Sequence, residues 1–267
     1  MKIWLSWLLI FAGITPLVSQ AEEPFFNGEH LEYSAKWTGV PAGEITLSTS
    51  KKEGDRWVFT MIAKTNSFWS MVYKVRDTVT STVSITPFRS HTYYKDAHQG
   101  SRHVVEKVEM DYKKREVRRS KQKISANEKP SLNTIKLEKH QDLVLDPLSM
   151  IFGIRKFSFL DTEELKKSEF HVFASKGIYD LKFELIEELD YNSQLFGTRK
   201  AWHVKPSAEY EGSLVSKGTL ELWVDCLTGV PLKILFNIPV GWATLELKSS
   251  NRSDLKKKPI RSRRRRR

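Results

Sequence analysis

The chain has 267 residues, of which 40% are hydrophobic and 28% charged, and its formal net charge is +12. Its single cysteine, Cys226, excludes an internal disulfide and therefore a disulfide-stapled scaffold, so the fold must be stabilised by its core. The length suffices for one large domain or two small ones. Because no flexible linker divides the middle of the chain, we expect a single β-rich domain over residues 22–250.

The first 21 residues are typical of a secretory signal peptide. Met1-Lys2 is a short basic start, Ile3–Val18 is mostly apolar, and Ser19 and Ala21 are the small residues that a signal peptidase reads. We expect cleavage after Ala21. The alternative is an uncleaved membrane anchor, but the apolar stretch is shorter than the ~20 residues of a membrane span. The sequence therefore predicts an exported protein, and in a bacterium with two membranes the expected location is periplasmic.

Most of the remaining chain alternates apolar and polar residues with a period of two, beginning at Leu31–Trp37 and ending at Ala243–Leu247. This period indicates strands with one buried and one wet face, which is typical of antiparallel sheet. We place the first turn at Gly39–Gly43. The predicted fold is mainly β: a large, curved antiparallel sheet or an open β-barrel-like domain with one or two short helices packed on it.

Two segments break the β pattern. Ser67–Tyr73 predicts a short helical turn. In Asp146–Arg155, an Asp directly before a Pro is typical of a helix cap followed by a first-turn proline. Apolar residues then cover most of the helix circumference, so we expect this helix to be buried against the concave side of the sheet.

Two basic segments stand out. Lys113–Lys123 is either an anion-binding patch or, as we favour, a solvated hairpin tip or charged edge strand. Residues 251–267 are predicted to be a disordered polybasic tail. Its last dozen residues, 256–267, carry nine positive charges and no acid: those of Lys256, Lys257, Lys258, Arg261, Arg263, Arg264, Arg265, Arg266 and Arg267.

The rest of the chain is nearly neutral. Removing the nine charges of the tail from +12 leaves +3, and removing Lys2 as well leaves +2. The high net charge therefore belongs to the tail. Inside a cell such a tail would suggest a nucleic-acid partner, but because we expect export, we expect no nucleic-acid partner. For an exported protein the natural partner of the tail is an anionic membrane surface or an anionic envelope polymer. The alternative is a solvated tail without a specific partner.

The sequence shows none of the usual catalytic arrangements: no G-x-S-x-G, P-loop, G-x-G-x-x-G or H-E-x-x-H. Cys226 has no local base, and the seven His residues lack metal-ligand spacing. We predict a protein that is not an enzyme and has no cofactor or metal. Glu29, Asp77 and Asp146 are either functional carboxylates or, as we favour, structural ones. Glu29 would pair with a basic neighbour, and Asp146 would cap the helix.

The aromatic residues favour an apolar ligand. A curved sheet with aromatic side chains on its concave face can line a pocket for a lipid or another hydrophobic ligand. The alternative is that these side chains fill the core. The candidate lining residues are Trp37, Trp69, Phe152, Trp223 and Trp242.

Four stretches together resemble one family. They are "FNGEHLEYSAKWTGVPAGEITL" from Phe26, "YKVRDTVTSTV" from Tyr73, "DPLSMIFGIR" from Asp146 and "GTLELWVDCLTGVPLKI" from Gly218. In this order and spacing the chain resembles the DUF3108 family of bacterial exported proteins, whose molecular function is unknown. The resemblance implies an exported, mainly antiparallel β domain and brings no activity and no catalytic residues. The segments 113–123 and 255–267 are not part of it.

Three functional hypotheses follow. The first is a non-enzymatic envelope protein of a double-membraned bacterium, which binds a lipid or amphipathic ligand in the curved sheet and contacts anionic surfaces through its basic tail. The second is a structural or protein-interaction module of the periplasm. The third is a hydrolase of an envelope polymer. The sequence does not set an oligomeric state.

Overall fold

The computed structural model describes residues 25–157, 170–174, 177–193, 195–208, 220–237 and 241–255. The predicted signal peptide, and Lys256–Arg267 of the predicted tail, lie outside the described residues. The fold is mainly β, as predicted, with a single 15-stranded sheet and two short α-helices in the described part of the chain. None of the described helices has the length and apolar character needed to cross a membrane.

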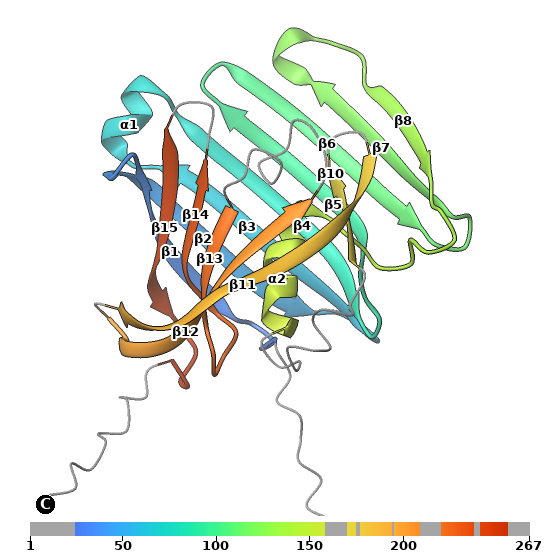
Figure 1. Ribbon diagram of the computed structural model, residues 1–267. Coiled ribbons are helices and arrows are strands. Elements are labelled where there is room, and N and C mark those ends of the chain that lie inside the picture. Colours follow the sequence, from blue (N-terminus) through green and yellow to red (C-terminus); the bar gives the residue numbers. More distant parts are fainter. Residues whose placement is uncertain are drawn as a thin grey trace, which may run out of the picture.

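The strands follow one another closely along the chain (Figure 1). They are β1 (His30–Trp37), β2 (Val40–Lys51), β3 (Arg56–Thr65), β4 (Val75–Ile85), β5 (Phe88–Gln99), β6 (Arg102–Asp111), β7 (Glu116–Lys123), β8 (Ser131–Lys136), β9 (Val144–Leu145), β10 (Phe170–Ala174), β11 (Gly177–Ser193), β12 (Gly197–Ala208), β13 (Leu220–Asp225), β14 (Pro231–Asn237) and β15 (Trp242–Ser250). The helices are α1 (Ser67–Val72) and α2 (Pro147–Phe157), and a 3-10 turn, η1, spans Ile124–Ala126.

The sheet is two meanders joined at their ends. Its order is β8-β7-β6-β5-β4-β3-β2-β1-β15-β14-β13-β12-β11-β10-β9, so the first strand pairs with the last. The neighbours are antiparallel except β9 and β10, which are parallel. The order confirms the large antiparallel sheet expected from the period-two pattern.

The sheet curls until its β9 edge lies against β5. The contact uses side chains: Tyr112 Oη donates to the carbonyl oxygens of Ser90 at 2.8 Å and Val144 at 3.2 Å. The backbone N–H of Asp146 donates to Ser90 Oγ at 2.9 Å. Strands β6 to β8 continue past this contact (Figure 1). The result is an open, barrel-like sheet that is closed by hydrogen bonds from side chains.

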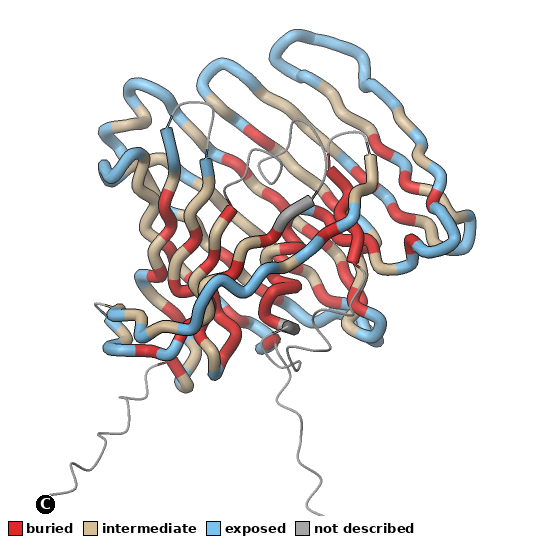
Figure 2. Tube along the Cα trace, in the orientation of Figure 1, coloured by how far each residue is buried: buried red, intermediate tan, exposed pale blue. Residues whose placement is uncertain are grey.

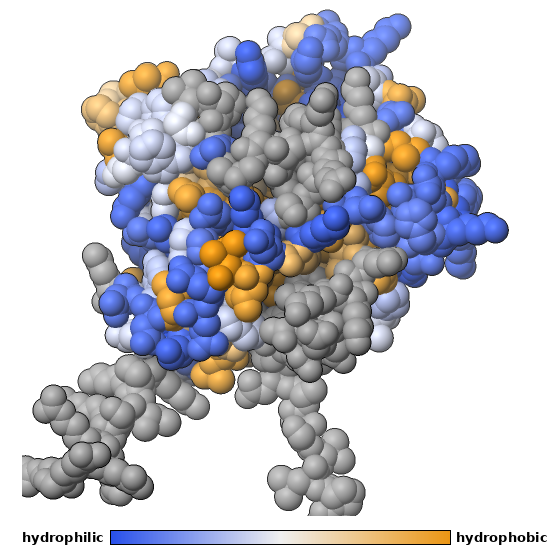
Figure 3. All heavy atoms as spheres, in the orientation of Figure 1, coloured by the Kyte–Doolittle hydropathy of each residue, from blue (hydrophilic) through white to orange (hydrophobic). Residues whose placement is uncertain are grey.

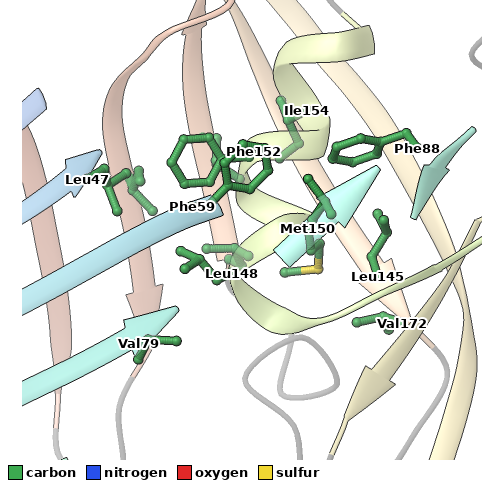
Figure 4. Packing of buried hydrophobic residues seen from close by; sticks show 14 of the residues in the cluster. Leu47, Phe59, Val79, Phe88, Leu145, Leu148, Met150, Phe152, Ile154 and Val172 are labelled. Carbon is green, nitrogen blue, oxygen red and sulfur yellow. The ribbon is translucent and has the colours of Figure 1, made fainter. Parts of the chain in front are cut away.

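Helix α2 fills one end of the concave face, as predicted. It packs against β3, β4 and β5 on one side and β9 and β10 on the other. The rings of Phe152 and Phe59 stack with their centroids 4.1 Å apart, near Phe88 (Figure 4). Phe25, in contact with the rings of Phe59 and Phe88, completes an aromatic cluster. Aromatic contacts of this kind add to the free energy gained by burying their large apolar surfaces. This cluster is the centre of the core.

The first turn is tighter than predicted. Thr38 and Gly39 both have positive φ, which gives a two-residue hairpin, and Pro41–Gly43 already belongs to β2. Gly43 is required for a different reason. A Cβ at this position would lie 2.1 Å from the carbonyl oxygen of Lys64 on β3. Gly43, which we placed in the turn, is therefore needed where strands β2 and β3 approach each other closely.

Candidate functional site

Burial changes along the concave face, from the α2 end to the α1 end. On β2 and β3, Leu47 and Phe59 are buried beside α2, whereas Ile45 and Met61, one inward-facing position farther along, are only half-buried. In Figure 2 the buried positions gather around α2, and many positions towards α1 are intermediate or exposed. We call the α1 end of this face the open half; its half-buried apolar members are Ala35, Ile45, Met61, Ala63 and Phe236.

The next strands give the concave face a polar side. Asp77 on β4 lies directly opposite Ala63 of β3 and Ala97 of β5, and its side chain is buried. Gln99 Nε2 donates to Asp77 Oδ2 at 2.5 Å, while Asp77 Oδ1 is buried without a hydrogen-bond partner among the described residues. Burial raises the pKa of Asp77, against the effects of Gln99 and Lys95. A buried oxygen of this kind can accept a hydrogen bond from a ligand.

Two of the predicted lining residues lie at the rim of the open half. Trp37 ends β1, and its ring meets that of Trp69 edge-on with centroids 5.1 Å apart. The Nε1–H of Trp69 donates to the carbonyl oxygen of Pro41 at 3.0 Å. The pair therefore borders the apolar surface as a fixed aromatic corner.

The other three candidates do not line the open half, and the prediction is corrected for them. Phe152 belongs to the packed cluster around α2. Trp223 lies on the convex face, where its ring stacks on His203 at 4.3 Å and lies under the ammonium of Lys233. Trp242 is exposed and also faces away from the concave side, since its neighbour Ala243 pairs opposite inward-facing Trp37. Both tryptophans occupy strand positions that are out of phase with the buried residues beside them.

Asp146 has a structural role. Its Oδ1 accepts hydrogen bonds from the backbone N–H groups of Leu148 at 2.9 Å and Ser149 at 3.0 Å, as expected of a helix cap. Its Oδ2 accepts from the hydroxyls of Ser81 and Ser90 on β4 and β5. Burial raises the pKa of Asp146 despite these donors. The carboxylate fixes the start of α2 to the sheet.

Glu29 is also structural, and it does have the predicted basic neighbour. Its carboxylate and the Arg155 guanidinium form a bidentate ion pair at the far end of α2, and both side chains are at most 1% exposed. Arg252 donates a further hydrogen bond to Glu29 Oε1 at 2.9 Å and also pairs with Asp254. Residues 251–255, counted with the tail above, thus belong to the domain, and Leu255 is fully buried.

Cys226 is poorly suited to nucleophilic chemistry. Its side chain is partly buried, and burial raises the pKa of its thiol to about 12, with Glu188 and Asp225 acting in the same direction. The thiol is therefore protonated at neutral pH, whereas the nucleophile in cysteine chemistry is the thiolate.

One His does lie beside a hydroxyl group. His91 Nε2 is 3.1 Å from Ser84 Oγ, but that hydroxyl donates to the carbonyl oxygen of Pro87 at 2.7 Å. Burial, with Arg56 and Arg89 nearby, lowers the pKa of His91 to about 4. In the described part of the chain no carboxylate is hydrogen-bonded to this His, so the pair lacks the orienting third group of a catalytic triad.

Two groups of side chains could hold a metal ion. Asp96, His98 and His103 meet on the β5–β6 hairpin, where both His Nε2 atoms lie within 3.2 Å of Asp96 Oδ1. His140, His171 and Asp180 form the second group. Hydrogen bonding to Asp96 already accounts for the geometry of the first group, and Arg76 lies directly across from His98. Pattern spacing along the chain missed it because His98 and His103 become neighbours only through strand pairing.

A small pocket lies outside the open half. It has a volume of about 190 Å³ and is bordered by the end of β11 and by β15, with Glu246, Lys248 and Asn192 among its lining residues. Ligand pockets for drug-sized molecules usually measure about 300–1,000 Å³ and are mainly apolar. This pocket contains none of the predicted lining residues.

The basic run 113–123 forms a hairpin tip and strand β7, which lies one strand inside the edge strand β8. Several of its charges are paired: Arg115 with Asp142, Arg118 with Glu109 and Glu116, Arg119 with Glu106, and Lys123 with Glu128. This pairing fits the solvated, structural interpretation that we favoured over an anion-binding patch.

Comparison with known proteins identifies the family. A family model described as "Protein of unknown function (DUF3108)" matches residues 32–248. The chain belongs to the DUF3108 family. This confirms the resemblance that the four sequence stretches indicated, and the match covers the strands from β1 to β15. No curated protein matches the chain.

The DUF3108 fold also resembles a solved structure. The crystal structure of a beta-barrel-like protein of domain of unknown function DUF1849, from Brucella abortus, aligns with a TM-score of 0.54 and 7% sequence identity. The alignment covers 84% of this chain and 97% of the other. At this identity the likeness concerns the fold alone.

Proposed function

We propose that this DUF3108 protein is a non-enzymatic envelope protein that binds a lipid or similar amphipathic ligand in the open half of its concave face. The observation that carries the proposal is the change in burial along β1 to β3. Strand positions that would be buried in a filled core remain half-exposed at the α1 end, although their side chains are apolar. Apolar surface left accessible in a concave site is a common feature of ligand-binding sites.

The distribution of polar groups supports an amphipathic ligand. The apolar side of the open half, on β1 to β3 and β14, would receive a hydrocarbon part. Asp77, with one oxygen free of described partners, would accept a hydrogen bond from a hydroxyl or ammonium group of the ligand. Such a ligand would satisfy both the exposed apolar surface and the buried oxygen.

Export and the basic tail complete the proposal. The predicted signal peptide and the family resemblance support a periplasmic location, and the nine charges of Lys256–Arg267 would attract the protein to an anionic envelope surface. No nucleic acid, metal or cofactor has a part in this proposal.

Native mass spectrometry of gently purified protein tests ligand binding. We expect an added mass of a few hundred daltons or more, as carried by a lipid, on a fraction of the protein. Ala63→Trp would fill the open half and should remove this mass, whereas Ile62→Trp, on the convex side of the same strand, should retain it. A clean unliganded mass across several preparations, or equal effects of the two variants, would count against the proposal.

The edge strand β8 favours a second candidate function, the protein-interaction module. In the described part of the chain β8 pairs only with β7, and Leu132 on it is 80% exposed. An exposed edge can add a strand from a partner. This alternative would be supported if a periplasmic protein co-purified with the unaltered chain but not with the Leu132→Lys variant.

A further inference from the structure

The short helix α1 exposes its apolar side chains. None of its six residues is buried, and Phe68, Met71 and Val72 are 63%, 79% and 70% exposed. Tyr73 and Val40 beside them are also exposed. We call these five residues the α1 tip; in Figure 3 the corner of the molecule at the place of α1 is coloured as hydrophobic. A surface helix normally turns its apolar side chains towards the core, so this arrangement points to a partner.

The α1 tip is held on a rigid base. Asn66 caps the helix by accepting a hydrogen bond from the N–H of Trp69 at 3.0 Å, and its own amide donates to the carbonyl oxygen of Pro41 at 3.1 Å. Trp69 bonds the same carbonyl oxygen and packs edge-on against Trp37. The exposed side chains are therefore presented by a fixed turn between β3 and β4.

A group of positive charges lies next to the tip, with Glu44 of β2, itself paired with Lys248, as the acid directly opposite Lys64. Lys64 and Arg76 are exposed and directly opposite each other on the convex side of β3 and β4. Lys74 and Arg102 are exposed nearby, after α1 and after the β5–β6 turn. Within the described residues none of these four forms an ion pair. Like charges placed directly across two strands destabilise a sheet, so an anionic partner would relieve their repulsion.

We propose that the α1 tip inserts into the surface of an anionic lipid bilayer, while Lys64, Lys74, Arg76 and Arg102 contact the lipid headgroups. Aromatic and other apolar side chains flanked by Lys and Arg are the chemistry that suits this interface. The proposal goes beyond the proposed function and does not require a bound ligand. It places the rim of the open half at the bilayer, because α1 joins the strand ends that form that rim.

An environment-sensitive dye tests insertion directly. Met71→Cys, in a full chain that also carries Cys226→Ser, is labelled with a nitrobenzoxadiazole (NBD) group and mixed with vesicles of phosphatidylglycerol and phosphatidylcholine. The matched control is Leu132→Cys in the same background, because Leu132 is 80% exposed and lies on the edge strand β8, away from α1. We expect the emission of the label at position 71 to shift to the blue and increase, and the label at position 132 to remain unchanged.

Partitioning of unlabelled protein provides the second measurement. Phe68→Ser with Met71→Ser should weaken binding to the same vesicles at least about tenfold, since two large apolar side chains no longer leave water. Leu132→Ser should leave binding unchanged. Lys64→Gln with Arg76→Gln should weaken binding only at low salt.

The opposite results would overturn the proposal. Equal responses of the two labels would show non-specific adsorption. Binding without any response at position 71 would show attachment through another segment. If the α1 tip instead docks on a protein, vesicles will leave the label at position 71 unchanged while a protein extract shifts it. The ligand experiment at Ala63 does not depend on these outcomes, so the two proposals fail separately.

Discussion

Substitution of a single residue should strongly destabilise this fold where that residue is half of a buried ion pair. Glu29 and Arg155 are almost completely excluded from water, so removing one partner leaves the other charge in the core. We expect Arg155→Leu to lower the free energy of unfolding by about 3 kcal/mol, the lower end of the usual range because Arg252 still pairs with Glu29. Urea unfolding measures the change.

A surface pair is the control for this prediction. Lys248 and Glu44 are 2.7 Å apart, but both side chains are exposed. Lys248→Gln should therefore change the free energy of unfolding by less than about 1 kcal/mol. Adding Glu29→Leu to Arg155→Leu should recover part of the loss, because the Glu29 carboxylate is then no longer buried without its main partner. Equal costs for Arg155→Leu and Lys248→Gln would contradict a role for burial.

His91 should make stability depend on pH. Its pKa in the folded protein is lowered to about 4 from 6.5, because burial and the charges of Arg56 and Arg89 disfavour the imidazolium, with Asp55 opposing them. The unfolded chain therefore binds the proton more readily between these values. The contribution of His91 to stability is present above pH 6.5 and is lost as the pH falls towards 4. In His91→Gln, the unfolding free energy should fall less steeply across this window than in the unaltered protein.

At the scale of elements, the cap of α2 connects a helix to the sheet. Asp146→Ala removes the acceptor for two helix N–H groups and for the hydroxyls of Ser81 and Ser90, all of which are buried. Loss of a cap and of buried hydrogen bonds together should cost at least about 2 kcal/mol. Asp146→Asn retains one oxygen acceptor and should cost less.

Urea unfolding also measures this prediction, with a nearby acid as its control. Asp142 lies four residues before Asp146 and forms an exposed ion pair with Arg115. Asp142→Ala should therefore cost less than about 1 kcal/mol. If Asp146→Ala is no more destabilising than Asp142→Ala, then α2 is held by its apolar packing alone.

Local signals in the sequence were sufficient to predict some of the helices and strands. The Asp-Pro start and the apolar circumference of α2 are determined within residues 146–157, and the alternation of β1 follows directly from its buried and wet faces. The alternation of apolar and polar residues is too weak to predict strands β5 and β12, because polar residues such as Lys95, Asp96, Lys200 and Lys205 interrupt it. Their neighbours in the sheet, rather than their own composition, make them strands.

The candidate site was less accessible to sequence reasoning. The phase of each strand can be read from its alternation, and Trp223 between buried Leu222 and Val224 already indicates the convex face. The position of the open half could not be read, because it depends on how far α2 extends along the concave face. The partner of Glu29 was equally hidden, since Arg155 lies 126 residues away along the chain.

Considered as a whole, the molecule has two different ends. Strand ends joined by α1 form one end, with the α1 tip and the rim of the open half. Glu29, Arg252 and Leu255 lie at the other end, where Asn251 is hydrogen-bonded to both His30 and Gly28 at the start of β1. The eight residues of β1 separate these ends by roughly 25 Å at the usual rise per residue. The chain therefore leaves the domain for Lys256–Arg267 at the end opposite the α1 tip.

The tail that we propose binds an anionic surface follows Leu255, at the end opposite the proposed membrane-binding α1 tip, so the protein should be able to bridge two membranes. We expect the full chain to cluster anionic vesicles at low salt, measured as turbidity, with Phe68→Ser/Met71→Ser and deletion of Lys256–Arg267 each abolishing the clustering. Clustering by the unaltered chain should itself fall as salt rises, because salt screens the charges of the tail. Binding to single vesicles should still be weakened by the tip variant at high salt, because the contacts of the tip are apolar. Leu132→Ser should cluster vesicles normally. If clustering survives both changes, neither segment bridges membranes. If only deletion of Lys256–Arg267 abolishes clustering, the α1 tip does not contribute to it.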